Sequence, residues 1–539
     1  MSPIRSVAVL GGGISGLSTA YYLSRALPHN VPITIYESSK RLGGYIESTR
    51  LMLPNASGTG REENVLFEHG PRTLRVNKRG VSSVNVFDLI RQLDLVDDLI
   101  IVPKRSVAAK NRYIFYGGKI NMIPYSITSI LKLYFSQPLF RGMLSEVLRE
   151  PFRRNKPMEV VEANDESIGS FMTRRFGPRI TERLISAAIH GIYAGDVNQL
   201  SVKSLFEPLW KNEKTSGSVV SLWKRRKSPG INGEENPYAE RHNEHLKELL
   251  ARNKNVMDYL RDASIVSFKN GMQSLTDRLR EVVLSSGNVT VRYEDPALHV
   301  ENVVDGIKVT SAKGARTYSH VFSALPSRTL AGLVATPLAE LLRKIPSVSV
   351  SVVNLFFSNP RLLPVTGFGY LLPKAVPREQ NPERALGVVF DSDAISRHHG
   401  KGDLPGNLQD SLEGTKLTVM LGGHWWNHDQ PVKEQDEAVA LARQLISRQL
   451  GVNETPVLAQ ATFQESCIPQ YVVGHHANLQ AIHKAVLAQF NGKLILVGAS
   501  FLGVSVNDCI YYARVAVEDV ITHSGKGISG LESKALYNY

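Results

Sequence analysis

Gly11-Gly12-Gly13-Ile14-Ser15-Gly16 is the stretch of the sequence that decides the fold. It follows the apolar run Val7-Ala8-Val9-Leu10 and opens a helical pattern over 17–25. Gly11, Gly13 and Gly16 have the G-x-G-x-x-G spacing, which permits a tight turn, close approach of a pyrophosphate and close helix–strand packing. The phosphates would lie at the positive end of the helix. Together with the β-branched run Ile33–Tyr36, the pattern predicts a dinucleotide-binding βαβ unit.

The residue at the end of the second predicted strand indicates which kind of dinucleotide the chain binds. Glu37 stands there, and an acidic side chain can accept hydrogen bonds from ribose hydroxyls while repelling a 2′-phosphate. Arg41-Leu42-Gly43-Gly44 follows. Paired glycines let a second backbone turn approach the pyrophosphate or a flavin.

The other end of the chain has a second glycine-containing turn. Val497-Gly498-Ala499-Ser500 follows the apolar run Leu494–Leu496, and Gly503–Asp508 precedes a helical pattern that extends to about residue 520. We expect this second helix N-terminus to face the ligand and to stabilise negative charge there.

Length and composition exclude several classes of protein. The 539 residues allow three to four domains at ~150 residues each. With 42% hydrophobic and 21% charged residues, the chain is neither disordered throughout nor collagen-like. Two cysteines, Cys467 and Cys509, exclude a disulfide scaffold and Cys-rich metal sites.

The net charge of +13 is compatible with anionic lipid or an acidic substrate, and also with an ordinary solvated surface. We find no nucleic-acid motif, and so predict no nucleic-acid partner. Only six residues precede the first strand, so we expect no cleavable presequence.

The segment 120–140 is apolar but interrupted by Pro124 and Pro138, which suits a membrane interface better than a membrane span. Basic amphipathic helices are expected from 122 to 166. They form either a docked helical subdomain or a membrane-binding surface. The polar segment 211–255 is predicted to be a surface insertion or linker.

We therefore predict an α/β fold: a Rossmann-type FAD-binding domain, a mixed-sheet substrate domain and an inserted helical membrane-associated subdomain. The FAD-binding parts are expected at 1–105, 263–335 and 456–525. The substrate-domain parts are expected at 106–120, 201–262 and 336–455, the helical subdomain at 121–200 and a tail at 526–539. Helical spacing over 84–93 and strand patterns at 289–292, 307–310, 347–357 and 417–421 support this division.

Glu37, Arg41 and Gly43-Gly44 in this order resemble the signature of the flavin amine oxidase and desaturase superfamily. Further segments resemble its protoporphyrinogen oxidase family, of the mitochondrial type. They are Phe67-Glu68-His69-Gly70-Pro71-Arg72, Asn111-Arg112-Tyr113, Gly367-Phe368-Gly369-Tyr370-Leu371, Leu417–Gly423, Cys467-Ile468-Pro469-Gln470-Tyr471 and Val506–Ile510.

The resemblance implies one non-covalently bound FAD per chain. It also implies oxidation of protoporphyrinogen IX by O2, in three two-electron rounds that each give hydrogen peroxide. The implied cofactor-binding residues are Gly11, Gly12, Gly13, Ile14, Ser15, Gly16, Glu37, Ser38, Arg41, Gly44, Tyr45, Gly70, Pro71, Arg72, Thr73, Ala297, Ala499, Val504, Ser505 and Val506. Tyr45 stands where relatives often carry Trp. His69 departs from an aliphatic residue of relatives, and is expected to be solvent-facing or structural.

The implied substrate-binding residues are Arg112, Phe368, Gly369, Leu371 and Met420. A flat apolar macrocycle with two propionates needs a cation at one edge and apolar walls over its faces. Arg112 would pair with a propionate, because its planar fork suits a carboxylate. Phe368 and Leu371 would sandwich the rings. No catalytic side chain and no metal ligand is predicted, because the flavin performs the redox chemistry.

The resemblance further implies a peripheral location on the mitochondrial inner membrane, with a membrane surface, a homodimer and a downstream ferrochelatase as partners. Two alternatives remain open. One is an amine oxidase or carotenoid-type desaturase on the same fold. The other is a non-redox binding protein similar to the GDP-dissociation inhibitors.

Overall fold

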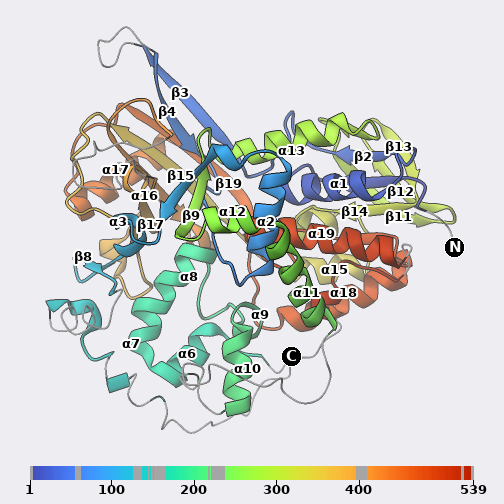
Figure 1. Cartoon of the computed structure of the whole chain (residues 1–539). Coiled ribbons are helices and arrows are strands. Elements are labelled where there is room, and N and C mark those ends of the chain that lie inside the picture. The colour runs from blue at the N-terminus through green and yellow to red at the C-terminus, as the bar shows by residue number, and fades with distance from the viewer. Residues whose placement is uncertain are drawn as a thin grey trace.

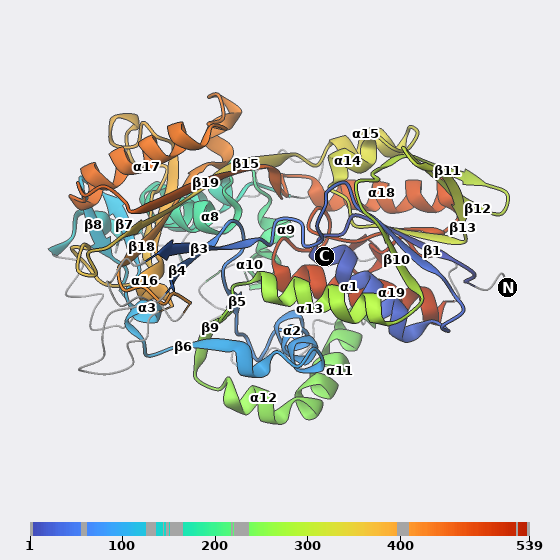
Figure 2. The ribbon, with the colours of Figure 1, turned by 90° about the horizontal axis from the view of Figure 1, so that it is seen from above.

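The computed structural model describes residues 4–54, 62–124, 136–143, 145–146, 150, 165–216, 219, 237–395, 409–523 and 527–535. Two large sheets organise these residues, and they lie side by side in both ribbon views (Figure 1, Figure 2). A parallel sheet carries the glycine loop, and a mixed sheet carries the predicted substrate residues. The α/β fold expected from the sequence is confirmed.

The parallel sheet has five strands in the order β10 (Val289–Arg292), β2 (Ile33–Tyr36), β1 (Val7–Leu10), β14 (His320–Ser323) and β20 (Leu494–Leu496). All four residues of β1 are buried, because both faces of the sheet are covered. Val7 and Val9 face a core formed with α1 (Ile14–Ala26), α13 (Gln273–Ser285) and α19 (Val506–Thr522). Ala8 and Leu10 face the opposite core, which includes β12 (Gly306–Ser311) and α18 (His475–Phe490).

The mixed sheet has seven strands in the order β19 (Leu458–Pro469), β15 (Ser347–Phe357), β18 (Thr415–Gly422), β17 (Ala385–Phe390), β16 (Gly369–Leu371), β7 (Tyr113–Tyr116) and β8 (Lys119–Met122). Helix α17 (Gln435–Leu450) packs on one face of this sheet. Helix α8 (Ser186–Tyr193) lies against β16 and β17 on the other.

The helices that follow residue 165 form a separate small core around Phe171, Ile189 and Trp210. They are α6 (Ile168–Phe176), α8, α9 (Val202–Leu205) and α10 (Glu207–Ser216), while Ile180 of α7 (Pro178–Ile180) packs in a neighbouring cluster with Leu139 and Ala187. The apolar and basic stretch expected to contact a membrane lies largely outside the described residues. Among the residues that are described, none of the helices combines the length and the apolar composition needed to cross a membrane.

Residues 237–252 correct the expectation of a loop. They form helix α11 (Pro237–Arg252), which packs on α2 (Val81–Gln92) beside α12 (Lys254–Tyr259). Leu249 is buried in the main core, and Arg241 pairs with Glu518 and Asp519 of α19. The sequence pattern did not predict this helix, because only a narrow apolar stripe runs through an otherwise charged segment.

The remaining elements connect these units. They are the hairpin β3 (Ser48–Pro54) and β4 (Glu62–Glu68), the small sheet β5 (Leu74–Arg75), β9 (Ala263–Phe268) and β6 (Leu99–Pro103), strands β11 (Ala297–Val303) and β13 (Gly314–Tyr318), and helices α3 (Val107–Lys110), α14 (Ser327–Ala331), α15 (Leu338–Arg343), α16 (Asp391–Ala394) and α20 (Glu532–Ala535).

Candidate functional site

The glycine loop joins β1 to α1 as the sequence predicts. Gly11 has a φ of 92°, and its amide donates to the Tyr36 carbonyl oxygen at 2.8 Å. A Cβ on Gly16 would lie 1.8 Å from the Gly11 carbonyl oxygen, so this turn of α1 can approach the loop only without a side chain. No side chain caps α1 at Gly13. The first-turn amides can therefore bind an anion.

The paired glycines form a second turn directly against the first. The Gly43 amide donates to the Gly12 carbonyl oxygen at 2.9 Å, and Gly44 has a φ of 59°. A Cβ on Gly44 would lie 3.0 Å from the Gly13 Cα. Arg41 holds this turn in place, since it donates to the Gly44 carbonyl oxygen at 2.7 Å.

Glu37 is already engaged by the protein. One carboxylate oxygen accepts from the Gly12 amide and the other from the Ser39 amide, both at 2.8 Å. The oxygen bonded to Ser39 also accepts from the Ser38 hydroxyl at 3.2 Å, so the oxygen bonded to Gly12 is the one that keeps a lone-pair site for a ribose hydroxyl. The predicted contact residue Ala297 lies close by, because the Asp295 amide donates to the Glu37 carbonyl oxygen.

The residues present fit a pyrophosphate. A Cβ on Gly13 would meet only the Gly44 Cα, at 3.8 Å, whereas a Cβ on Gly12 would lie 2.3 Å from the Leu42 side chain. Gly12 is therefore required by the protein's own packing. Gly13 faces open space beside an uncapped helix end, which is the arrangement that a bound phosphate needs.

The C-terminal segment closes on the same loop. A Cβ on Gly498 would lie 3.4 Å from the Ser15 hydroxyl oxygen, and the Tyr471 hydroxyl donates to the Ala499 carbonyl oxygen at 2.6 Å. The Ser505 side chain caps α19 by accepting from the Asp508 amide. The Asp508 carboxylate reduces the positive potential at this helix end, which opposes the expected stabilisation of negative charge.

Gly70 and Arg72 lie in the segment that connects β4 to β5. A Cβ on Gly70 would lie 1.9 Å from the Tyr45 carbonyl oxygen, so these two predicted cofactor segments touch. Arg72 donates to Asp391 at 2.7 Å, and both side chains are nearly buried. The Arg72 guanidinium thus joins the segment that contains Gly70 to the mixed sheet. Direct contact of Arg72 with a flavin remains a prediction, as do the other cofactor contacts.

His69 is 2% exposed, which excludes the solvent-facing alternative. Its ring lies between two hydroxyls, with Nε2 2.9 Å from Thr49 and Nδ1 2.8 Å from Thr462. Burial lowers the pKa of His69, so the ring is neutral. His69 therefore links the segment before Gly70 to strand β19.

Glu68 is a buried carboxylate beside His69. It accepts from the Ser48 hydroxyl at 2.6 Å and from the Met272 amide at 2.8 Å. Burial raises the pKa of Glu68 from 4.5 to about 7, although Arg72 and Lys416 act in the opposite direction.

Replacing Glu68 with Gln should remove one component of the pH dependence of stability. Because the folded protein holds this proton more tightly than the unfolded chain, the contribution of Glu68 is complete below pH 4.5 and is lost as the pH rises through 7. The shift corresponds to roughly 3 kcal/mol. The melting temperature of Glu68→Gln relative to the unmodified protein should therefore increase from pH 5 to pH 8. Exposed Glu294→Gln is the control, and a Glu68→Gln difference that does not change with pH would contradict this assignment.

The structure brings together Arg112 and Phe368, two of the predicted substrate-binding residues. The Arg112 guanidinium lies over the Phe368 ring, 5.6 Å from its centroid. Desolvation and the neighbouring Arg75 lower the pKa of Arg112. The guanidinium groups of Arg112 and Arg75 therefore lie near each other, and together they could bind a carboxylate ligand.

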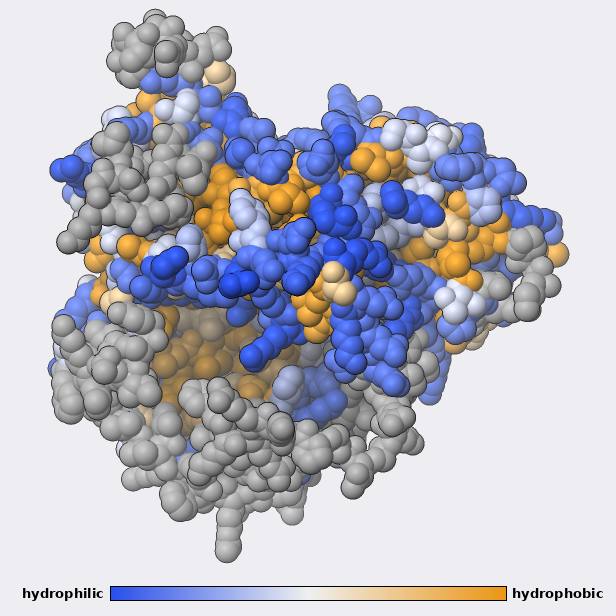
Figure 3. Space-filling model, in the orientation of Figure 1, coloured by the Kyte–Doolittle hydropathy of each residue, from blue (hydrophilic) through white to orange (hydrophobic). Residues whose placement is uncertain are grey.

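Leu371 and Met420 share another surface. Gly387 pairs with both residues across β16, β17 and β18, so the two side chains flank it on one face of the mixed sheet. That face is covered by α8, where a Cβ on Gly191 would touch Leu371. Phe368 packs instead with Ile100, Ala394 and Ile395. At the place where Figure 1 labels α8, Figure 3 shows an apolar hollow, and Ile192 of α8 is 57% exposed.

A buried histidine pair beside this face was missed by sequence reasoning. His190 and His424 approach each other with their Nε2 atoms 2.8 Å apart, and His190 Nδ1 donates to the Leu372 carbonyl oxygen. Burial lowers the pKa of His190 to about 4 and that of His424 to about 3, so both rings are neutral. Since 234 residues separate them, no local spacing could have indicated the pair.

Comparison with known proteins identifies the family. The family model described as flavin containing amine oxidoreductase matches residues 14–521. A Schizosaccharomyces pombe protoporphyrinogen oxidase is 36% identical, with 94% of this chain and 96% of the relative covered. A Bos taurus protoporphyrinogen oxidase is 33% identical, with 96% and 98% covered. The crystal structure of an Exiguobacterium protein has the same fold, with a TM-score of 0.71 at 22% identity over 96% of this chain and 99% of its own.

The family match covers the chain from the start of α1 into the last turn of α19, and it implies a flavin cofactor. The chain belongs to the flavin-containing amine oxidoreductase family and, within that family, groups with the protoporphyrinogen oxidases.

Proposed function

We propose that the chain oxidises protoporphyrinogen IX to protoporphyrin IX with FAD and O2. The observation that carries this proposal is near-complete alignment with two protoporphyrinogen oxidases, at 36% and 33% identity. Six electrons and six protons leave the substrate, and three O2 molecules accept them to give three hydrogen peroxide molecules. The bound FAD would supply the electron transfer, while the protein binds and orients.

The chain's own residues position the two ligands. The Gly13 loop and the first turn of α1 bind the pyrophosphate, and Glu37 accepts from the ribose. Arg112 pairs with a propionate at the edge of the macrocycle, beside Phe368. Leu371 and Met420 would supply an apolar wall beside α8, and this wall would exclude water from the reacting ring.

Non-covalent attachment of FAD is supported by the state of the cysteines. Burial raises the pKa of Cys467 to about 12 and that of Cys509 to about 11. Both groups therefore remain thiols rather than nucleophilic thiolates at neutral pH. Denaturation in acid should release the entire flavin into solution.

The deciding experiment compares substrates. The purified, flavin-containing protein should convert protoporphyrinogen to fluorescent protoporphyrin with oxygen uptake, and should leave amine substrates unoxidised. A colourless protein without flavin would support the non-redox binding alternative instead. Amine oxidation without porphyrin formation would support the amine oxidase alternative. The curated relatives favour neither outcome.

Arg112→Ala is expected to weaken substrate binding while flavin content stays the same. Loss of one charge-assisted contact should raise KM by about tenfold or more. Steady-state kinetics and flavin absorbance measure the two effects. Arg105→Ala, which removes a neighbouring exposed arginine, is the control. Unchanged kinetics would remove Arg112 from the site.

We further propose a peripheral location on the mitochondrial inner membrane, as for a eukaryotic-type enzyme, with a homodimer and a downstream ferrochelatase as partners. The net charge of +13 supports attraction to anionic lipid. Sedimentation with anionic liposomes, compared with neutral ones, tests the membrane contact.

A further inference from the structure

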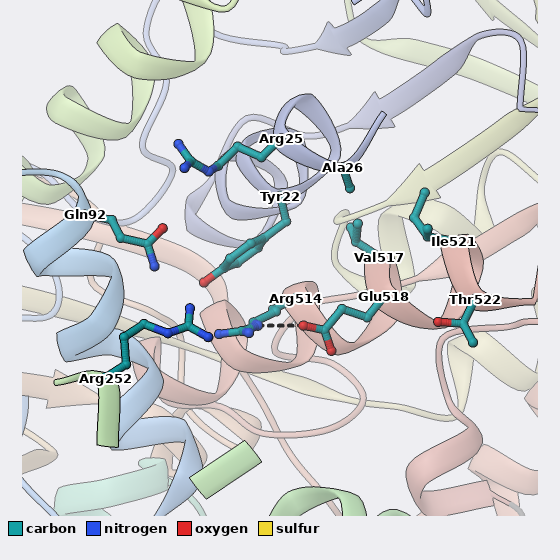
Figure 4. A pocket seen from close by; sticks show the side chains of 10 residues that line it. All are labelled: Tyr22, Arg25, Ala26, Gln92, Arg252, Arg514, Val517, Glu518, Ile521 and Thr522. Carbon is teal, nitrogen blue, oxygen red and sulfur yellow. Dashed lines mark hydrogen bonds and ion pairs between the residues drawn. The ribbon is translucent and has the colours of Figure 1, made fainter. Parts of the chain in front are cut away.

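A pocket of about 300 Å³ lies on the parallel-sheet unit, and Figure 4 shows the residues that line it. Helices α1, α2, α11 and α19 line this open pocket with residues from their C-terminal parts. Along α1, the lining residues Tyr22 to Ala26 lie about 13 to 20 Å from Gly13, and no lining residue belongs to the predicted cofactor or substrate residues. The pocket therefore belongs to neither the cofactor site nor the substrate site.

Three arginines line this pocket: Arg25, Arg252 and Arg514. Arg514 is well paired, because it donates to Glu518 at 2.7 Å and to Asn85 at 2.9 Å. Arg25 lies over the Tyr21 ring. Within the described parts of the chain, no carboxylate oxygen comes within ion-pair distance of Arg25.

Arg252 is only weakly compensated. It lies 3.9 Å from Asp88, the same carboxylate oxygen that Arg514 approaches at 3.7 Å. Asp88 already accepts from Arg91 at 2.9 Å and from Gln92 at 2.6 Å. In Figure 4 the side chains of Arg252 and Arg514 point toward one another across the pocket.

The pocket walls carry an excess of positive charge. Three guanidinium groups line them, and Glu518 is the single carboxylate among the lining residues. Helix C-termini carry partial negative charge, which accounts for an arginine near each end. Arg252 and Arg514 converge on one oxygen of Asp88, which offsets part of their mutual repulsion, but Asp88 also accepts from Arg91 and Gln92 and so compensates neither guanidinium fully. A ligand with two negative charges would complement the walls.

The pocket also offers a neutral donor and an apolar side. The Tyr22 hydroxyl accepts from Asn85 at 3.3 Å, which leaves its own proton for a ligand. Burial raises the pKa of Tyr22, so the phenol keeps that proton. Ala26, Val517 and Ile521 provide the apolar side.

We propose that this pocket binds the phosphate group of a phosphate monoester. Arg25, Arg252, Arg514 and the Tyr22 hydroxyl would donate to the phosphate oxygens, and the ester portion would lie along Val517 and Ile521. A tetrahedral phosphate presents oxygens to donors that arrive from three helices, whereas a planar carboxylate presents them in one plane. The proposal does not depend on the oxidation of protoporphyrinogen.

The test is titration calorimetry on the flavin-containing full chain, with inorganic phosphate and glycerol 3-phosphate at constant ionic strength. The unmodified protein and Arg316→Gln, which removes an exposed arginine on β13, should bind saturably. The double variant Arg25→Gln/Arg252→Gln should bind at least about tenfold more weakly. Arg514 is left intact, because it also holds Glu518 and Asn85.

A second arm separates a soluble ester from a lipid headgroup. Vesicles of phosphatidylcholine with and without phosphatidic acid are sedimented with the same three proteins. Saturable binding of glycerol 3-phosphate that the double variant loses supports a soluble ester. Sedimentation that requires both phosphatidic acid and the two arginines supports a lipid phosphate. If the double variant equals the unmodified protein with every probe, the proposal is overturned.

Discussion

Gly13→Ala should yield a folded protein that retains less than about a tenth of its flavin. The backbone at Gly13 is extended, with φ −70° and ψ −176°, so alanine can adopt it without strain. Its Cβ would touch only the Gly44 Cα, at 3.8 Å. The apoprotein should therefore keep its melting temperature. The methyl group would, however, occupy the position where the second glycine of the motif meets the pyrophosphate.

Gly16→Ala is the matched comparison. Its Cβ would lie 1.8 Å from the Gly11 carbonyl oxygen, so this variant should lose thermal stability whether or not flavin is present. The ratio of flavin to protein absorbance and the melting curve of the apoprotein separate the two cases. Full flavin retention by Gly13→Ala would show that the phosphate lies elsewhere.

Asp391→Ala should destabilise the protein by about 3–5 kcal/mol, because it leaves the Arg72 guanidinium buried without its partner. Asp391 accepts from Arg72 and from Thr418, both at 2.7 Å. The Thr418 hydroxyl also contacts the side-chain oxygen of Asn354. The side-chain nitrogen of Asn354 in turn donates to the Glu68 carbonyl oxygen at 3.0 Å. The variant should therefore also loosen flavin binding, since this network holds the segment before Gly70.

Thermal unfolding and flavin release measure the two effects of Asp391→Ala. The exposed pair Asp258–Arg261 supplies the control, and Asp258→Ala should change neither quantity measurably. The double variant Arg72→Met/Asp391→Leu removes both charges and should regain part of the lost stability. If Asp391→Ala melts like the unmodified protein, the ion pair contributes nothing to the junction of the two sheets.

Several elements could be predicted because their signals are local. One short stretch of sequence contains the run Val7–Leu10, the glycine spacing at 11–16 and the helical pattern over 17–25. Elements β1, α1 and β2 confirm these predictions. Helix α2 and strands β10, β12, β15 and β18 likewise follow from side-chain periodicity. Helix α11 did not, because charged residues surround its apolar stripe.

For the candidate site, too, the features with local sequence signals could be predicted and the others could not. The sequence by itself determined the glycine turn between β1 and α1, and it predicts a dinucleotide ligand and an acidic ribose acceptor there, since both chemistries need particular residues at short spacing. Only the tertiary structure decided that His69 is buried between Thr49 and Thr462, and that Leu371 and Met420 share one face while Phe368 packs elsewhere. It alone brought His190 to His424 and Arg72 to Asp391. These contacts depend on strand order and helix docking, which no short stretch of sequence encodes.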